Sequence, residues 1–206
     1  GMNEYVQSRA RQLAELGYVA FVADMYGGGK VTTDAKEARS LAGVLKGNRP
    51  ELRKRAQAAL EELRQRPQVD RERVAAIGYC FGGTTVLELA RSGADVKGVV
   101  SFHGGLDFPE ALTTGSVTAR SLVLHGADDP MVPEEQVTKF MDEMRAAGAS
   151  VHLVAYPGAV HSFTNPAAGS DKSKGVAYDK DADEKSWVAM KEFLSEVLGG
   201  ENASGN

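Results

Sequence analysis

The sequence predicts an α/β domain in which a mostly parallel sheet is flanked by helices. Apolar runs of strand length alternate with longer segments of helical spacing, which is typical of parallel strands covered on both faces. The chain has 206 residues, enough for one well-buried core. No internal repeat or linker interrupts the alternation. We therefore expect a single domain over residues 1–198 and a flexible C-terminal tail over 199–206.

The first third of the chain is predicted to hold three helices and one strand. Apolar residues have helical spacing over 3–16. The run YVAFVAD over 18–24 is β-branched and aromatic, which predicts a strand buried on both faces. Further helices are expected over 34–46 and over 51–66, the second ending before a proline.

The rest of the chain alternates regularly between the two kinds of segment. Strand-like runs cover 73–79, 95–104, 121–126 and 151–156. Helical spacing starts directly after the first of these runs, at residue 80, and returns over 133–148 and 183–198. A parallel sheet collects its functional residues beyond the carboxyl ends of its strands, so these ends deserve the closest inspection.

Composition excludes several classes of protein. The 24 basic and 28 acidic residues give a net charge of −4, so nothing favours a nucleic-acid or anionic-membrane partner. No apolar run has the length of a membrane helix, and the first residues lack a secretory pattern. The single cysteine excludes an internal disulfide and a cysteine-rich zinc site. We expect a cytoplasmic protein without a cofactor or a metal.

The strand over 73–79 runs into Gly78-Tyr79-Cys80-Phe81-Gly82-Gly83 and then into a helix. A turn of this kind needs glycines two residues before and after its nucleophile, because side chains there would clash. It raises Cys80 above the sheet and directs the amides of the new helix at it. Those amides favour a thiolate, and the Phe81 amide could hold an oxyanion. The alternative is a buried free cysteine in a packing turn.

Two later strand ends offer an acid and a base. Asp128 and Asp129 follow the strand over 121–126, and their carboxylates suit the orienting of an imidazole. His161 follows the last strand after a Pro-Gly turn. The order Cys80, Asp129, His161 is the order of nucleophile, acid and histidine in α/β-hydrolases. A thiol nucleophile needs a base to take its proton and an acid to orient that base.

Other residues at the strand ends allow weaker hypotheses. His103 and His125 could form a metal pair, but no further residue with ligand spacing joins them. The side chains of Tyr26, Tyr79 and Phe163, with Phe81, could line an apolar substrate pocket, and ordinary packing explains them equally well. The glycine-rich run over 27–30 lacks the frame of a phosphate loop.

These motifs resemble the dienelactone hydrolase family of α/β-hydrolases. The matching stretches are RARQLAELGYVAFVADMYG, IGYCFGG, HGADDPMVP and YPGAVHSFTN. The resemblance implies an α/β-hydrolase fold with Cys80 as nucleophile, His161 as general base and Asp129 as triad acid. It favours Asp129 over Asp128 because the family places the acid three residues after a glycine, here Gly126.

The chain departs from the family pattern at two places. Members usually carry early strands and a His-Glu-x-x-Gly loop before the first helix, and this loop donates a second oxyanion amide. The sequence opens at residue 1 just before that helix, so we expect the early strands and that donor to be missing. Members that cleave dienelactone hold its carboxylate with an arginine just after the histidine. Ser162 stands there instead, and the first basic residue after His161 is Lys172.

Two functions follow as hypotheses. The first is a carboxymethylenebutenolidase-like hydrolase that cleaves small-molecule esters or lactones through a Cys-His-Asp triad and an acyl-enzyme. The second is an α/β-hydrolase scaffold that is inactive because the N-terminal loop is absent. We expect a monomer or a homodimer in either case. A redox sensor is disfavoured because the chain offers Cys80 no resolving cysteine.

Overall fold

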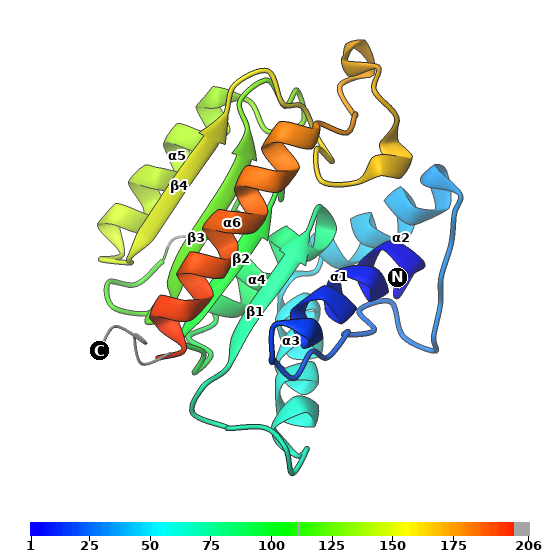
Figure 1. The fold of residues 1–206 in the computed structure, drawn as a ribbon. Helices are drawn as coiled ribbons and strands as arrows, with labels where there is room; N and C mark the ends of the chain where they lie inside the picture. Colours follow the sequence, from blue (N-terminus) through cyan, green and yellow to red (C-terminus); the bar gives the residue numbers. More distant parts are fainter. Residues whose placement is uncertain (111, 200–206) are drawn as a thin grey trace, which may run out of the picture. The chain divides into compact units, whose positions relative to one another are not determined.

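The computed structural model describes residues 1–110 and 112–199 and divides into two compact units, residues 1–71 and residues from 72 onward (Figure 1). The tail predicted over 199–206 lies outside the described residues, except for Gly199. The single domain over 1–198 remains a prediction.

The first unit consists of three helices, which confirm the predicted ones to within two residues. They are α1 (Glu4–Glu15), α2 (Ala35–Lys46) and α3 (Arg49–Arg64). Each begins after an Asn or Asp whose side chain accepts a hydrogen bond from a first-turn amide, which is the favoured way to start a helix. Helices α2 and α3 pack against each other.

The prediction of a strand over 18–24 is wrong. All four strands of the described chain lie in the second unit, and residues 18–24 pair with none of them. Val19 and Phe21 are exposed. The run has the composition of a strand, but strand propensity mainly reflects packing against neighbouring strands, and the first unit offers none. The glycine-rich loop that follows is organised by the Asp24 carboxylate, which accepts hydrogen bonds from the Gly27 and Gly29 amides.

The second unit contains a four-stranded sheet in the order β1-β2-β3-β4, with every neighbouring pair parallel. The strands are β1 (Ala75–Tyr79), β2 (Gly98–Phe102), β3 (Arg120–Gly126) and β4 (Val151–Tyr156). The inner strand β2 is buried throughout, as its apolar sequence predicts, while β1 and β4 at the edges are only partly buried. The predicted α/β fold class with a parallel sheet is confirmed.

Three helices flank this sheet, namely α4 (Phe81–Arg91), α5 (Glu134–Ala146) and α6 (Lys180–Val197). Figure 1 shows α6 crossing one face of the sheet, with α4 and α5 behind the other. Helix α6 approaches β2 so closely that a Cβ on Gly98 would lie 2.7 Å from the Phe193 ring. Two short 3-10 turns, η1 (Pro166–Ala168) and η2 (Lys172–Lys174), lie between β4 and α6.

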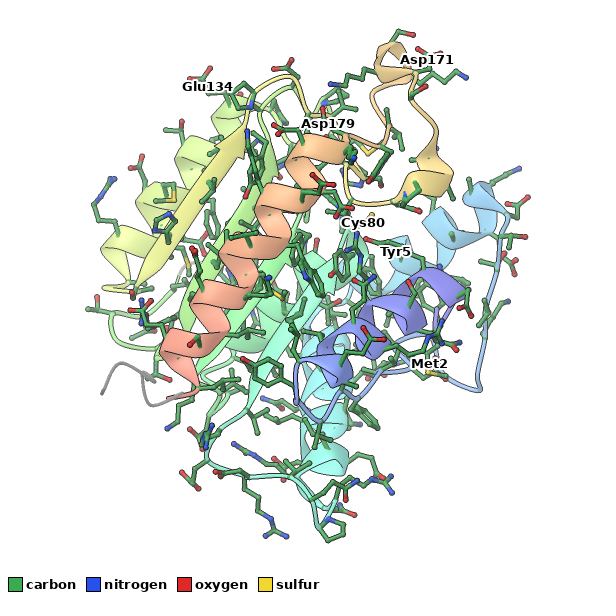
Figure 2. The ribbon with its side chains drawn as sticks, viewed as in Figure 1. Met2, Tyr5, Cys80, Glu134, Asp171 and Asp179 are labelled. Carbon is green, nitrogen blue, oxygen red and sulfur yellow. The ribbon has the colours of Figure 1, made fainter. Side chains whose placement is uncertain are left out.

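Because the strands are parallel, their carboxyl ends all lie at the same end of the sheet. The residues that follow these ends include Cys80, His103, Asp129 and His161, one from each strand in chain order. Figure 2 labels Cys80 at this edge, together with Glu134 at the start of α5 and Asp179 at the start of α6. The fold therefore gathers the predicted chemical groups at one end of the second unit.

Candidate active site

Cys80 occupies the sharp turn between β1 and α4. It is the N-cap residue of α4, its φ and ψ are 52° and −114°, and its side chain is exposed. A positive φ is unusual for a residue other than glycine and stores backbone strain. The thiol thus lies at the positive end of the α4 dipole, where an anion is stabilised. Phe81 is the first residue of α4, so its N–H is one of those at that end.

The sequence predicts that a side chain at either Gly78 or Gly82 would clash, and the structure shows such a clash at Gly78 only. A Cβ on Gly78 would lie 1.9 Å from the Gly82 carbonyl oxygen, so Gly78 has no room for a side chain. A Cβ on Gly82 would meet nothing within 4 Å, and the prediction that it too is crowded is wrong. Gly83 is crowded instead, since a Cβ there would lie 2.8 Å from Gly104 Cα. The first turn of α4 therefore packs closely against the loop after β2.

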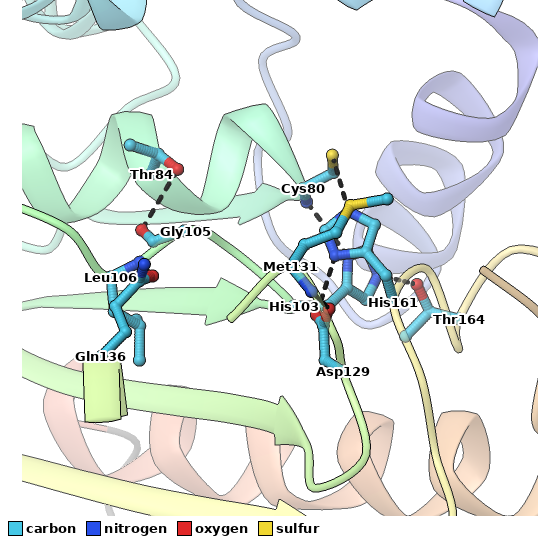
Figure 3. A network of polar contacts seen from close by, with 10 residues as sticks. All are labelled: Cys80, Thr84, His103, Gly105, Leu106, Asp129, Met131, Gln136, His161 and Thr164. Atoms are coloured by element: carbon cyan, nitrogen blue, oxygen red, sulfur yellow. Dashed lines mark hydrogen bonds and ion pairs between the residues drawn. The ribbon is translucent and has the colours of Figure 1, made fainter. Parts of the chain in front are cut away.

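Cys80, His161 and Asp129 form a continuous chain of hydrogen-bonded groups (Figure 3). His161 Nε2 lies 3.1 Å from Cys80 Sγ, and His161 Nδ1 lies 2.8 Å from Asp129 Oδ2. A carboxylate only accepts hydrogen bonds, so the proton on Nδ1 points to Asp129 and Nε2 faces the sulfur. This is the arrangement in which an imidazole can exchange a proton with a thiol.

The acid side of this chain is fixed by its loop. Asp129 is buried, and its Oδ1 accepts a hydrogen bond from the Met131 amide at 2.8 Å. Both carboxylate oxygens therefore have a partner. The neighbouring Asp128 is exposed, and it is Asp129 that contacts His161.

The backbone of His161 is held by the segment that precedes α6. His161 N–H donates to Gly175 O, and Ala177 N–H donates to His161 O. Gly175 has a φ of 72°, and a Cβ there would lie 2.5 Å from Pro130 Cγ, next to Asp129. The segment around Gly175 therefore lies against both the histidine and the acid loop.

The charge on His161 depends on its two partners. Burial acts to lower the pKa of His161, but the hydrogen bonds and charges of Asp129 and Cys80 outweigh it and raise this pKa to about 9. Asp129 and Cys80 thus both favour the protonated form of His161.

His103 and His125 are both buried near this pair. His103 hydrogen-bonds through both ring nitrogens, to the Cys80 amide and to Thr164 Oγ1. Burial lowers the pKa of His125; His161 lowers it further and Asp129 opposes both. Within residues 1–110 and 112–199, no cluster of three or more His, Cys, Asp or Glu side chains is arranged to hold a metal.

The aromatic residues expected to line a substrate pocket have different surroundings in the structure. Phe163 is fully buried, with ring centroids 5.1 Å from His103 and 5.4 Å from Tyr156, which favours the packing alternative. Tyr79 stacks on Phe102 at 4.6 Å. Tyr26 belongs to the first unit, where its hydroxyl donates to Ala38 O.

Comparison with known proteins establishes the family. The profile of the Dienelactone hydrolase family matches residues 1–198. The chain belongs to this family. Its α/β-hydrolase fold agrees with the crystal structure of a dienelactone hydrolase-like promiscuous phosphotriesterase, P91, from metagenomic libraries. The two chains are 46% identical with a TM-score of 0.87, over 96% of this chain and 82% of the other.

Two curated relatives are more distant. A provisionally named carboxymethylenebutenolidase of Salmonella typhimurium is 25% identical over 97% of this chain and 74% of its own length. A provisionally named 2-oxo-3-(5-oxofuran-2-ylidene)propanoate lactonase of Bradyrhizobium is 27% identical over 79% of this chain and 69% of its own length. The chain is therefore a dienelactone hydrolase family hydrolase with carboxymethylenebutenolidase-like relatives. None of its described helices is long and apolar enough to cross a membrane.

Two parts of the site were not predicted from the sequence of this dienelactone hydrolase family chain. Thr164, which bonds His103, lies 61 residues away from it in the chain. Gly175 and Ala177, which hold the His161 backbone, lie in a charged stretch with no strand pattern. The signal that Gly175 offered is a glycine after a short polar stretch, and it indicates a turn rather than a contact with a histidine.

Proposed function

We propose that this chain hydrolyses small-molecule esters or lactones with Cys80 as nucleophile, His161 as general base and Asp129 as the acid that orients it. The observation that carries the proposal is the chain of contacts from Cys80 Sγ to His161 Nε2 at 3.1 Å and from His161 Nδ1 to Asp129 Oδ2 at 2.8 Å. It is supported by the position of each residue at a strand end and by the lactonase and carboxymethylenebutenolidase names of relatives.

The first half of the proposed reaction forms an acyl-enzyme. The Cys80 thiolate attacks the carbonyl carbon, a C–S bond forms, and the carbonyl π electrons move onto oxygen. The Phe81 amide at the start of α4 donates to this oxyanion. When the oxyanion collapses, the C–O bond to the alcohol breaks. His161 then gives its Nε2 proton to the departing alkoxide, which leaves a thioester on Cys80.

The second half regenerates the thiolate. His161 Nε2, now unprotonated, takes a proton from a water molecule as that water attacks the thioester carbonyl. The new tetrahedral oxyanion collapses, the C–S bond breaks, and the carboxylic acid leaves. Asp129 keeps the imidazole oriented through both halves and stabilises its protonated form. A thiolate is a good leaving group, so in the first tetrahedral intermediate it departs again unless the substrate's own leaving group is also good. Activated substrates such as aryl esters, enol esters and lactones are therefore favoured over amides.

The surroundings of His161 favour substrates that carry no carboxylate beside the scissile bond. The first basic residue after His161 is Lys172, and its ammonium group is paired with Asp179 at 2.6 Å. The four residues directly after His161 carry no charge. We therefore propose neutral esters and lactones as the substrate class.

The test is hydrolysis of p-nitrophenyl acetate by the full chain and by Cys80→Ala and His161→Gln. Both substitutions should reduce turnover to the uncatalysed background, and one equivalent of iodoacetamide should do the same to the unmodified chain. His152→Gln is the matched control, because His152 is exposed on β4. Equal rates for all four proteins would refute the proposal and support the inactive scaffold.

A second activity, hydrolysis of aryl phosphotriesters, is favoured by the 46% identity to the phosphotriesterase over 96% of this chain. The same thiolate would attack phosphorus and expel the aryloxide, and water would then cleave the P–S bond. Diethyl p-nitrophenyl phosphate has the same leaving group as the ester, so one assay compares both. Phosphotriester turnover should vanish in Cys80→Ala. Release of p-nitrophenolate that persists in Cys80→Ala would exclude Cys80 as its nucleophile, and no release above background by the unmodified chain would exclude the activity.

A further inference from the structure

Backbone strain in this protein is concentrated at the site. Among the described residues other than glycine, positive φ angles occur at Cys80 (52°), His103 (38°) and Ser162 (61°). Such conformations cost about 1–3 kcal/mol each and persist only where the surroundings hold them. Cys80 carries the thiol, and Ser162 directly follows the base. His103 is the third strained residue, and the hydrolytic steps proposed above give it no part.

The His103 ring connects the other two strained turns. The Cys80 N–H is shared between Phe102 O at 3.0 Å and His103 Nδ1 at 3.2 Å, and His103 Nε2 lies 2.8 Å from Thr164 Oγ1. Thr164 is two residues beyond Ser162 on the loop that carries His161. Figure 3 shows His103 between Cys80 and Thr164. One side chain thus bonds both the turn of the nucleophile and the loop of the base.

These two hydrogen bonds define the protonation of His103. A backbone N–H can only donate, so Nδ1 must be unprotonated, and the neutral ring then carries its proton on Nε2 and donates it to Thr164. The ring also lies edge-on to His161, with centroids 5.4 Å apart. A neutral ring at this distance leaves the positive charge of the pair on His161, whereas a second imidazolium would repel it.

The environment of His103 favours a fixed position over a mobile one. His103 is 2% exposed and Thr164 is completely buried. The ring packs edge-to-face on Phe163 at 5.1 Å. A buried histidine with both nitrogens bonded has one orientation available, and neither nitrogen remains for a metal.

We propose that His103 is a positioning residue for the Cys80–His161 pair. By bonding the Cys80 amide and the Thr164 hydroxyl at once, it holds the two strained turns at the separation that brings Sγ and Nε2 within 3.1 Å. This inference rests on the proposed function only in treating that pair as the reacting groups. It concerns the state of the thiol, which can be measured without a substrate.

Three substitutions separate the two bonds of His103. His103→Asn keeps an acceptor near the Nδ1 position and tolerates the positive φ. His103→Gln keeps a donor near the Nε2 position, and His103→Leu removes both. On the loop, Thr164→Val removes the hydroxyl with little change of shape and Thr164→Ser restores it. His152→Leu, at an exposed histidine of β4, is the matched control.

The first readout is the thiolate itself, followed by its absorbance at 240 nm across a pH series and by the rate of alkylation with iodoacetamide. His103→Leu and Thr164→Val should lower the thiolate fraction and slow alkylation at pH 7, while Thr164→Ser and the control should match the unmodified chain. His103→Asn and His103→Gln should give intermediate values. A merely structural role would lower the melting temperature and leave the titration of the thiol unchanged.

The second readout is turnover of p-nitrophenyl acetate. Misplacement of reacting groups by about 1 Å can cost roughly 100-fold in activity. We expect that loss in kcat for His103→Leu and Thr164→Val, with KM nearly unchanged. A folded His103→Leu with unaltered thiolate titration and kcat would overturn the inference. If His103→Leu does not fold, the same result for Thr164→Val and His103→Gln would overturn it equally.

The two readouts distinguish this inference from the proposed function. A chain without turnover, whose thiolate still depends on His103 and Thr164, would refute the hydrolase and keep the positioning role. If turnover depends on Cys80 but neither turnover nor the thiolate depends on His103 and Thr164, the hydrolase is supported and the positioning role is refuted.

Discussion

At the turn that carries Cys80, one added methyl group has opposite consequences at Gly78 and Gly82. The Cβ of an alanine at 78 would lie 1.9 Å from a backbone oxygen, which cannot move without displacing the first turn of α4. The same atom at 82 enters open space on a helix. The two glycines are related symmetrically to the cysteine in the sequence, yet only one of them is required by packing.

Gly78→Ala should therefore destabilise the protein by about 1–3 kcal/mol or more, the usual cost of overpacking. Gly82→Ala should be neutral or stabilise it by up to about 1 kcal/mol, since alanine loses less entropy than glycine in a helix. Urea denaturation of both variants measures the difference. Equal stabilities would show that the turn relaxes freely around residue 78.

At the scale of residues, the sequence predicted which three side chains meet at the site but not the hydrogen bonds that hold them in place. Cys80, Asp129 and His161 could be found because each follows an apolar strand, and parallel strands end at one edge. The bond between His103 and Thr164 could not, because no local pattern specifies which buried hydroxyl faces a histidine 61 residues away.

At the scale of elements, prediction succeeded where a segment carries its own pattern. Every predicted helix is present to within a few residues, and so are the four strands of the second unit. The segment over 18–24 failed because its composition matches a strand but its pairing depends on a neighbour. Segments without a periodic pattern, such as the one around Gly175, acquire their structure from the histidine loop that they contact.

Helices α4 and α5 are linked by a buried ionic cluster. The Arg91 guanidinium is fully buried and bonds Glu88 at 3.2 Å and Glu143 at 3.0 Å. Phe108 lies over it, with its ring centroid 4.3 Å from the guanidinium carbon. Burial raises the pKa of Glu143, and the charge and hydrogen bond of Arg91 act against this rise.

Arg91→Met should destabilise the protein by about 3–5 kcal/mol at neutral pH, because it leaves the buried Glu88 carboxylate and the partly buried Glu143 carboxylate without their cation. The loss should shrink as the pH falls and Glu143 takes up a proton, since a carboxyl whose pKa is raised on folding destabilises the fold only when ionised. Denaturant titrations at pH 5 and pH 7.5 test this.

The control is Arg145→Met on α5, which breaks an exposed pair with Asp142 and should change stability far less. If both variants were equally stable, Arg91 would be dispensable for joining the two helices.

At the scale of the second unit, the sheet order follows the chain order, so each strand end delivers one residue of the site in turn. Cys80 follows β1, His103 β2, Asp129 β3 and His161 β4. The site is thus assembled from the whole sheet and depends on the stability of the whole sheet. Conversely, the charge state of the site contributes to the stability of the fold.

The free energy of unfolding should therefore depend on pH through His161. Its pKa is raised on folding from an ordinary value of 6.5 to about 9. The stabilisation is fully present below pH 6.5 and is lost as the pH rises through 9. The stability advantage of the unmodified chain over His161→Gln should thus be largest near pH 6 and smallest near pH 10, measured by urea denaturation. An advantage that grew with pH would contradict the raised pKa.

The order of the strands also has a consequence for the newly made chain. Cys80 and His161 are 81 residues apart, and every other group of the site is translated between them or after them. At 5–20 residues per second, the ribosome needs about 4–16 s to reach the histidine after it has added the cysteine. During that interval the growing chain carries an ordinary thiol, and the reactive pair exists only once the fourth strand has joined the sheet.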